Sequence, residues 1–466
     1  MSKHDGTGWD KLEWRRRLET FGDDDSPVIA RGPKGEVDAV CNLGELTDEG
    51  RQTTLKLGQR LRHLYVDQLK YMPALISDAD MIYLRATPIP RALESVQQSF
   101  WGMYPPSSRT LDFPPPTIVT RTPADETLFP NDGNCRRFSQ LSRAFAQRTA
   151  DRWNDTKDMD YLNKLISKWM PPHSSRLAVD SHPRLSGVMD TVNSTLAHGP
   201  ETRLPKEFYN PKAREIIDKI ACEEWFSGYK ESREYRSLGI GALMGDIVSR
   251  MSGSIEENGK DGLLEIGGPD GKEGNGRGGE RGIKFAMSGC HDTTLAGIIA
   301  SLGAFEGDEF RWPPYTSHVA IELFKKDEAF GTTGSGQTTA RPPIKLTSES
   351  ARQKSLWSSL FGSFLTGSQS DAIGRRCVDE MNENERTVMN EYFVRLRFND
   401  RPLSIPGCKP AGNHLEGDES FCTFEAFKRL VDDFTPRNWK QACASNLDHP
   451  AFPRSNQPAG VIPTQA

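Results

Sequence analysis

The sequence lacks the features of several protein classes. No apolar run approaches the roughly 20 residues that a transmembrane helix needs. The opening residues, MSKHDGTGWDKLEWRRRLETF, contain no apolar segment of the kind found in a signal peptide. A net charge of -5 and an isoelectric point near 6.1 provide no overall basic field for nucleic acid. We therefore expect no transmembrane segment and no nucleic-acid partner, and we favour a cytoplasmic or mitochondrial location over a secreted one.

Cysteine is also scarce, with eight in 466 residues, which is too few for a disulfide scaffold. The sequence contains no Cys-x-x-Cys, and no Cys/His grouping has the spacing of a zinc site. We therefore predict no metal. Cys408 and Cys422 flank a polar loop and could pair in an oxidising compartment. Because no signal peptide is visible, free thiols are the preferred expectation and a bridge is the alternative.

What the sequence does contain is a repeated order of strand and helix. Residues 46–69 have leucines at helical spacing. Residues 81–86 form an apolar run that suits a buried strand, and a helical pattern follows at 91–103. The same order returns as a strand at 283–289 and a helix at 292–302. This alternation is typical of an α/β domain, in which ligands lie beyond the carboxyl ends of the strands.

The length of 466 residues suits several domains or one core with large insertions. A Pro-rich stretch near residue 113 opens a long, mostly helical middle region, and residues 267–282 are half glycine and almost wholly polar. Asn399-Asp400 are typical turn residues for a hairpin at 392–405. We predict a first part of the α/β core at 1–106, a helical cap at 107–225, a second part of the core at 226–326 with a flexible loop at 267–282, a low-complexity insertion at 327–375, and a C-terminal hairpin and tail at 376–466.

Three polar residues stand at the ends of the predicted strands. Arg85 ends one strand, and His291 and Asp292 follow another. An arginine fork suits phosphate oxygens, and a histidine near a helix N-terminus would add a second cationic donor. Asp292 could pass a proton to a leaving oxygen, since neighbouring phosphate charge favours its protonated form. The set suggests phosphoryl transfer without a metal.

Each of these residues also has a purely structural interpretation. Arg85 could be an ion-pair partner at a strand end, His291 a capping or core histidine, and Asp292 an ordinary first-turn acid. Arg91 and Glu94 are expected to make local ion pairs within their helix. A His-Asp dipeptide alone does not decide between these interpretations.

Four blocks of sequence resemble the histidine acid phosphatases, which form branch 2 of the histidine phosphatase superfamily. The blocks, in family order, are LGELTDEGRQTTLKLGQRLRHLY, LRATPIPRALES with FWGMYPP, SGCHDTTLAGIIASLG, and WPPYTSHVAIELF. Trp-Pro-Pro and Leu-Thr-x-x-Gly resemble the lysophosphatidic-acid-phosphatase-like group most closely.

The resemblance implies a phosphoglycerate-mutase-like three-layer α/β sandwich with a mostly helical cap, at 107–225, that sets substrate choice. It implies acid-phosphatase-type hydrolysis of a small-molecule phosphate monoester, without any cofactor or metal. In this family's scheme Arg85 and His291 hold the phosphoryl oxygens, and Asp292 protonates the leaving alcohol. A lysophospholipid phosphate is the first substrate class to consider, and an inositol phosphate the second.

The family's nucleophile motif, Arg-His-Gly-x-Arg-x-Pro, is missing from the sequence. Of the nine histidines only His63 follows an arginine, and it lies inside the helix predicted at 46–69. The nearest imitation, AHGPETRLP at 197–205, lies in the predicted cap and after Arg85, whereas the family motif precedes that arginine. We therefore expect the first core strand and its histidine to be absent. Either the sequence starts at an internal methionine, or the chain is a shortened, inactive relative used for phosphate binding or assembly.

Overall fold

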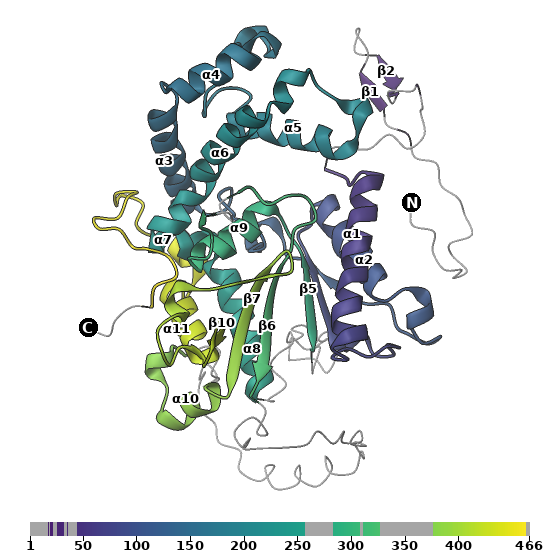
Figure 1. Ribbon diagram of the computed structural model, residues 1–466, viewed down its shortest axis with the longest axis vertical. Helices are drawn as coiled ribbons and strands as arrows, with labels where there is room; N and C mark the ends of the chain where they lie inside the picture. The colour runs from purple at the N-terminus through teal and green to yellow at the C-terminus, as the bar shows by residue number, and fades with distance from the viewer. Residues whose placement is uncertain are drawn as a thin grey trace.

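The computed structural model of the protein describes residues 17, 19–21, 26–31, 35, 44–256, 283–307, 311–326 and 376–462. The loop predicted at 267–282 and the insertion predicted at 327–375 lie outside these residues. The strands are β1 (Glu19–Phe21), β2 (Pro27–Ile29), β3 (Ile82–Ala86), β4 (Ile118–Val119), β5 (Phe285–Gly289), β6 (Val319–Lys325), β7 (Tyr392–Phe398), β8 (Arg401–Leu403), β9 (His414–Leu415) and β10 (Asp418–Thr423). The helices are α1 (Asp48–Leu61), α2 (Pro90–Met103), α3 (Arg136–Trp153), α4 (Lys157–Ile166), α5 (Leu185–His198), α6 (Pro211–Glu231), α7 (Arg233–Arg236), α8 (Ala242–Glu256), α9 (Asp292–Ser301), α10 (Glu383–Met389), α11 (Phe424–Phe434) and α12 (Trp439–Ala444). They form an α/β core with a group of helices above it (Figure 1).

The helices α1 and α2 pack closely against each other. The Thr47 hydroxyl accepts the backbone N–H of Gly50 and so caps α1. Gly58 of α1 and Gly102 of α2 meet at the contact, where a Cβ on Gly58 would stand 2.0 Å from the carbonyl oxygen of Ser99. The helix predicted at 46–69 is thus confirmed, although it continues beyond Leu61 as a π-helical turn.

The strands form two separate sheets besides the small β1–β2 pair. The first sheet has the order β4-β3-β5, and all three strands are parallel. The second is antiparallel, with the order β6-β7-β10-β9 and with β8 paired to β7. The predicted hairpin is confirmed, because β7 and β8 turn through Asn399 and Asp400, whose φ angles of 46° and 71° lie in the left-handed region.

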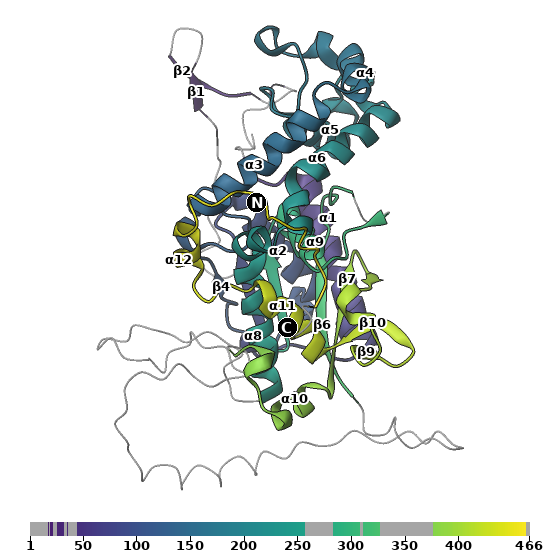
Figure 2. The same cartoon turned by 90° about the vertical axis from the view of Figure 1, so that its left-hand side faces the viewer.

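Helices cover both faces of the parallel sheet, as a three-layer sandwich requires. Ile82 and Leu84 of β3 face the hydrophobic cluster that includes α2. Tyr83 points the other way, where the guanidinium of Arg250 on α8 lies 4.0 Å from its ring centroid. Successive side chains of a strand point to opposite faces, and both faces are covered, so every residue of β3 is buried. Figure 2 shows α8 and α11 on the side of the sheets away from α1.

The two sheets meet at strands that have open edges. Within the described residues, β5 pairs only with β3 and β6 only with β7. Side chains still join the two strands, because Tyr65 packs edge-on against Phe285 of β5 and donates a 2.7 Å hydrogen bond to Glu322 of β6. Every residue of β3 is buried, whereas most of β5 and β6 is only half-buried or exposed. Within the described residues, the backbone N–H and C=O groups on the facing edges of β5 and β6 therefore have no strand partner.

The helices α4, α5 and most of α6 form a unit above the sheets (Figures 1 and 2). They share a hydrophobic cluster of their own, which includes Leu162, Leu185 and Ile217. This unit falls within the cap predicted at 107–225. No described helix is both long and apolar enough to cross a bilayer.

The expectation of free thiols at Cys408 and Cys422 is wrong. These two residues form a disulfide with a Cα–Cα distance of 5.2 Å, because the polar loop between them folds back against β10. A second disulfide joins Cys135, before α3, to Cys443 in α12, at a Cα–Cα distance of 4.7 Å. Their separation of 308 residues left no local signal in the sequence.

Candidate functional site

The polar residues predicted at the strand ends come from neighbouring parallel strands. In the register of β3 and β5, Arg85 lies opposite Ser288. The backbone N–H of Thr87 donates to the carbonyl of Gly289 at 3.2 Å. The Thr87 hydroxyl lies 3.1 Å from Nε2 of His291, which joins the loop after β3 to the residue before α9. Arg85 and His291 therefore lie at the same carboxyl edge.

Arg85 is buried and already paired. Its Nη2 donates to Oε1 of Glu126 at 2.6 Å and to the hydroxyl of Thr127 at 3.1 Å. Its Nη1 lies 3.8 Å from Oδ2 of Asp246 on α8, and its Nε has no hydrogen-bond partner within the described residues. Burial lowers the pKa of the guanidinium, and the nearby charge of Arg121 adds to this effect. The ion-pair interpretation of Arg85 is therefore correct.

His291 differs from the expected second cation. Its pKa is lowered from 6.5 to about 4, chiefly by burial and also by the positive charge of Arg91, while the negative charge of Glu126 acts in the opposite direction. The imidazole is therefore uncharged at neutral pH as the site is arranged here. The ring of Phe129 packs edge-on against the imidazole, and the backbone N–H of His291 donates to the Thr294 hydroxyl in the first turn of α9.

Asp292 is the first residue of α9, and both of its carboxylate oxygens accept a hydrogen bond. The backbone N–H of Thr293 donates to Oδ1 at 2.8 Å, and the indole Nε1 of Trp312 donates to Oδ2 at 2.6 Å. The backbone N–H of Trp312 in turn donates to Asp218 of α6 at 3.1 Å. Trp312 therefore orients Asp292 and connects it to the helices above the sheets.

The sequence did not point to several neighbours of these residues. Arg121 comes two residues after β4, so it reaches the same carboxyl edge as Arg85. Glu126 and Asp246 were not singled out, because nothing in their local sequence shows that they will meet an arginine. The local ion pair expected for Glu94 is wrong, since it accepts a 2.5 Å hydrogen bond from Arg51 of α1. That contact joins α1 to α2 and does not lie within a single helix.

Neither histidine considered as a nucleophile follows a strand of the parallel sheet. His63 is exposed on the π-helical turn Arg62–Gln68, where the neighbouring Arg62 bonds to the carbonyl of Met103 at the far end of α2. His198 is the last residue of α5 in the upper helical unit. The described part of the chain also contains no group of three or more His, Cys, Asp or Glu residues placed to hold a metal ion.

Comparison with known proteins places this chain among phosphatases. A probable acid phosphatase of Schizosaccharomyces pombe is 33% identical over 448 residues, which cover 93% of this chain and 83% of the relative. The human lysophosphatidic acid phosphatase type 6 is 24% identical, over 61% of this chain and 58% of its own length. A solved structure of Hafnia alvei phytase in complex with tartrate covers 86% of this chain and 89% of the phytase, with 13% identity and a TM-score of 0.49.

The family model of the histidine phosphatase superfamily (branch 2) matches residues 2–335, which include the β3 and β5 strands and the residues at their carboxyl ends. The predicted family resemblance and fold class are thus confirmed, and acid-phosphatase-type hydrolysis is supported at the level of the family. This chain belongs to the histidine phosphatase superfamily, branch 2.

Proposed function

We propose that this chain supplies the phosphate-binding and proton-donating part of a site that hydrolyses a phosphate monoester. The observation that carries the proposal is the meeting of Arg85 and His291 at one carboxyl edge, with Asp292 opening α9 beside them. The N-terminus of α9 adds a partial positive charge that favours an anion.

Each residue has a distinct role in the proposed reaction. Arg85 holds phosphoryl oxygens through the donors that Glu126 does not use. His291 is neutral as arranged here, so a phosphate dianion would draw a proton to it and gain a second donor. Asp292 gives its proton to the ester oxygen as the phosphorus–oxygen bond breaks, and the alcohol leaves uncharged.

We further propose that the attacking histidine belongs to a strand outside this sequence. The sequence contains no Arg-His-Gly, and the facing edges of β5 and β6 are unpaired within the described residues. A strand between them would complete one continuous sheet and would end beside His291. Its imidazole nitrogen would bond to phosphorus, and water would later break that phosphorus–nitrogen bond and release phosphate.

A lysophospholipid phosphate is the substrate class that we favour. Relatives named lysophosphatidic acid phosphatase support it. An exposed aromatic surface also adjoins the proton donor, because Trp312, which bonds to Asp292, packs edge-on against Trp225, and Trp225 is 41% exposed. Such a surface would accept an alkyl or acyl chain better than it would accept an inositol ring that carries several charges.

Phosphate binding tests the site in the chain as it stands. Arg85→Ala should abolish binding of inorganic phosphate or vanadate in isothermal titration calorimetry, since a charged fork contributes about 1.5–3 kcal/mol. Asp292→Asn should leave binding unchanged or tighten it, because an ionised carboxylate repels the anion. Arg137→Ala is the matched control, because this arginine is equally buried and is paired with Glu234 away from the site. Equal loss of binding in both arginine variants would show that the effect is structural.

Catalysis tests the missing strand. Fusing a strand that carries Arg-His-Gly-x-Arg-x-Pro to this chain should produce hydrolysis of phosphate monoesters. Asp292→Asn in that fusion should slow an alkyl phosphate more than an aryl phosphate, since the poorer leaving group depends more on the proton. An inactive but folded fusion would favour a phosphate-binding protein over an enzyme. Equal rates with and without Asp292 on the alkyl phosphate would remove this residue from the mechanism.

A further inference from the structure

A second arginine stands beside Arg85 at the carboxyl edge of the parallel sheet. Arg121 follows β4, which pairs with β3 so that Val119 lies opposite Arg85. Its Nη1 donates to the Thr127 hydroxyl at 2.9 Å, and Arg85 donates to the same hydroxyl at 3.1 Å. The two guanidinium groups therefore converge on one oxygen atom.

The charges in this corner are balanced by a carboxylate that reaches both arginines. Oδ2 of Asp246 accepts a 2.6 Å hydrogen bond from Nη2 of Arg121 and lies 3.8 Å from Nη1 of Arg85. Two cations at such a short separation repel each other, and an anion that lies between them offsets this repulsion. The charge of Arg121 accordingly lowers the pKa of Arg85. The geometry is that of an anion site made by two arginine forks, with the Asp246 carboxylate as the anion.

The two carboxylates near Arg85 are held very differently. The Glu126 side chain is fully buried, and its Oε1 also accepts the backbone N–H groups of Thr127 and Leu128. The Asp246 side chain is 43% exposed and its partner Arg121 is 32% exposed. Glu126 is therefore fixed in the fold, whereas Asp246 can turn toward solvent at little cost.

We propose that Arg121 is a second phosphate-binding arginine of this site, and that Asp246 is an internal carboxylate which a phosphate monoester displaces. This inference rests on the proposed function of the Arg85 site and extends it. Phosphate matches the double fork better than a single carboxylate does, because it offers more oxygens and more charge. Displacement of Asp246 also favours dianionic phosphate over weaker anions such as carboxylates, which gain less from the exchange.

The competing explanation is that Arg121 and Asp246 simply tie the loop after β4 to α8. In that case neutralising Asp246 would not help phosphate to bind, and removing Arg121 would change only stability. Displacement predicts that Asp246→Asn binds phosphate more tightly. The structural explanation predicts no gain in phosphate affinity.

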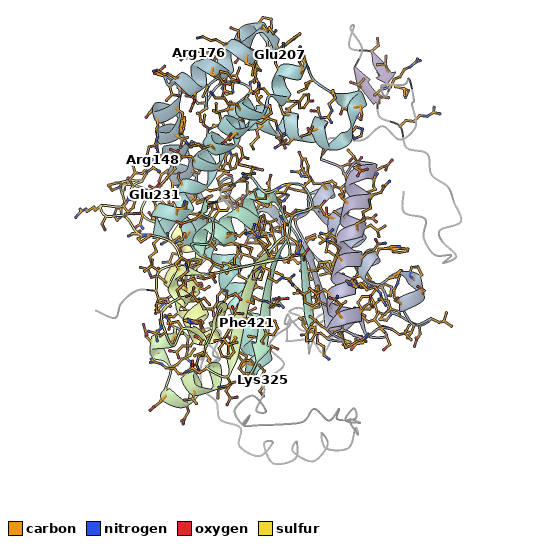
Figure 3. The ribbon with its side chains drawn as sticks, in the orientation of Figure 1. Arg148, Arg176, Glu207, Glu231, Lys325 and Phe421 are labelled. Carbon is orange, nitrogen blue, oxygen red and sulfur yellow. A yellow bond between two sulfur atoms is a disulfide. The ribbon has the colours of Figure 1, made fainter. Side chains whose placement is uncertain are left out.

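The experiment is titration calorimetry of the whole chain with inorganic phosphate and, separately, with vanadate. We expect Asp246→Asn to tighten binding about fivefold, the size of a partly exposed ion pair. Arg121→Ala should weaken binding at least about tenfold, the loss of a charged hydrogen bond. Glu231→Gln and Arg148→Ala are matched controls, because this pair has similar exposure, a 2.7 Å contact and a location on α6 and α3 away from the site (Figure 3). Neither control should change phosphate affinity.

The outcomes separate this inference from the proposed function. If Arg85→Ala abolishes binding while Arg121→Ala stays within twofold of the wild type, the role of Arg121 is refuted and the site itself survives. Unchanged or weaker binding in Asp246→Asn, with a melting temperature equal to that of Glu231→Gln, refutes the displacement. If neither the wild type nor Asp246→Asn binds phosphate or vanadate, both proposals fail together.

Discussion

Removal of the disulfide between Cys135 and Cys443 should destabilise the protein more than any other cysteine change. The bond closes a loop of 308 residues and joins the start of α3 to α12, and both cysteines are buried. The chain-entropy relation assigns about 6 kcal/mol to a 308-residue loop and about 3 kcal/mol to the 14-residue loop between Cys408 and Cys422. The longer loop thus contributes about 3 kcal/mol more, because it restricts the unfolded chain more.

The assay is urea unfolding at pH 7, without reductant, of two double variants followed by circular dichroism. Cys135→Ser with Cys443→Ser should lose more free energy of unfolding than Cys408→Ser with Cys422→Ser. A whole domain has about 5–15 kcal/mol of stability, so the first variant should be marginal or unfolded.

A thiol titration of the denatured wild type, again without reductant, provides the control. The sequence has eight cysteines, so two disulfides leave at most four thiols. A count of eight would refute both bonds. With both bonds present, equal stability losses in the two double variants would refute the loop-length reasoning.

Three further changes test burial at the site and packing between α1 and α2. The pKa of His291 falls from 6.5 to about 4 on folding, so the unfolded chain takes up the proton first as the pH drops. Lowering the pH from 7 to 5 should therefore reduce the free energy of unfolding by about 2 kcal/mol through this group. His291→Asn should flatten that part of the pH profile of urea unfolding, and an unaltered profile would contradict the buried neutral imidazole. Glu126→Gln should cost about 3–5 kcal/mol, because it leaves a buried guanidinium without its carboxylate, and a loss below about 1 kcal/mol would contradict the pairing. Gly58→Ala should cost about 1–3 kcal/mol by pressing its Cβ against the Ser99 carbonyl, whereas Gly133→Ala, with open space around it, should be nearly neutral in thermal unfolding.

The sequence by itself predicted the elements whose patterns are local. The apolar run before Arg85 and the helical pattern after it are contained in about 20 residues, and the same holds for the run before His291. Parallel strands present their carboxyl ends at one edge, so Arg85, His291 and Asp292 would approach one another if their two strands were neighbours, and the pairing of β3 with β5 supplies that condition. The turn at Asn399-Asp400 was equally local, since both residue types tolerate positive φ.

Only the tertiary structure decided which charges surround these residues. Arg121, Glu126 and Asp246 come from a strand end, a loop and a helix whose sequences show no sign that they will meet. The uncharged state of His291 depends on burial and on the position of Arg91. Both kinds of information arise from contacts between segments far apart in the chain, because desolvation and Coulomb interactions depend on distance in space and not on sequence spacing.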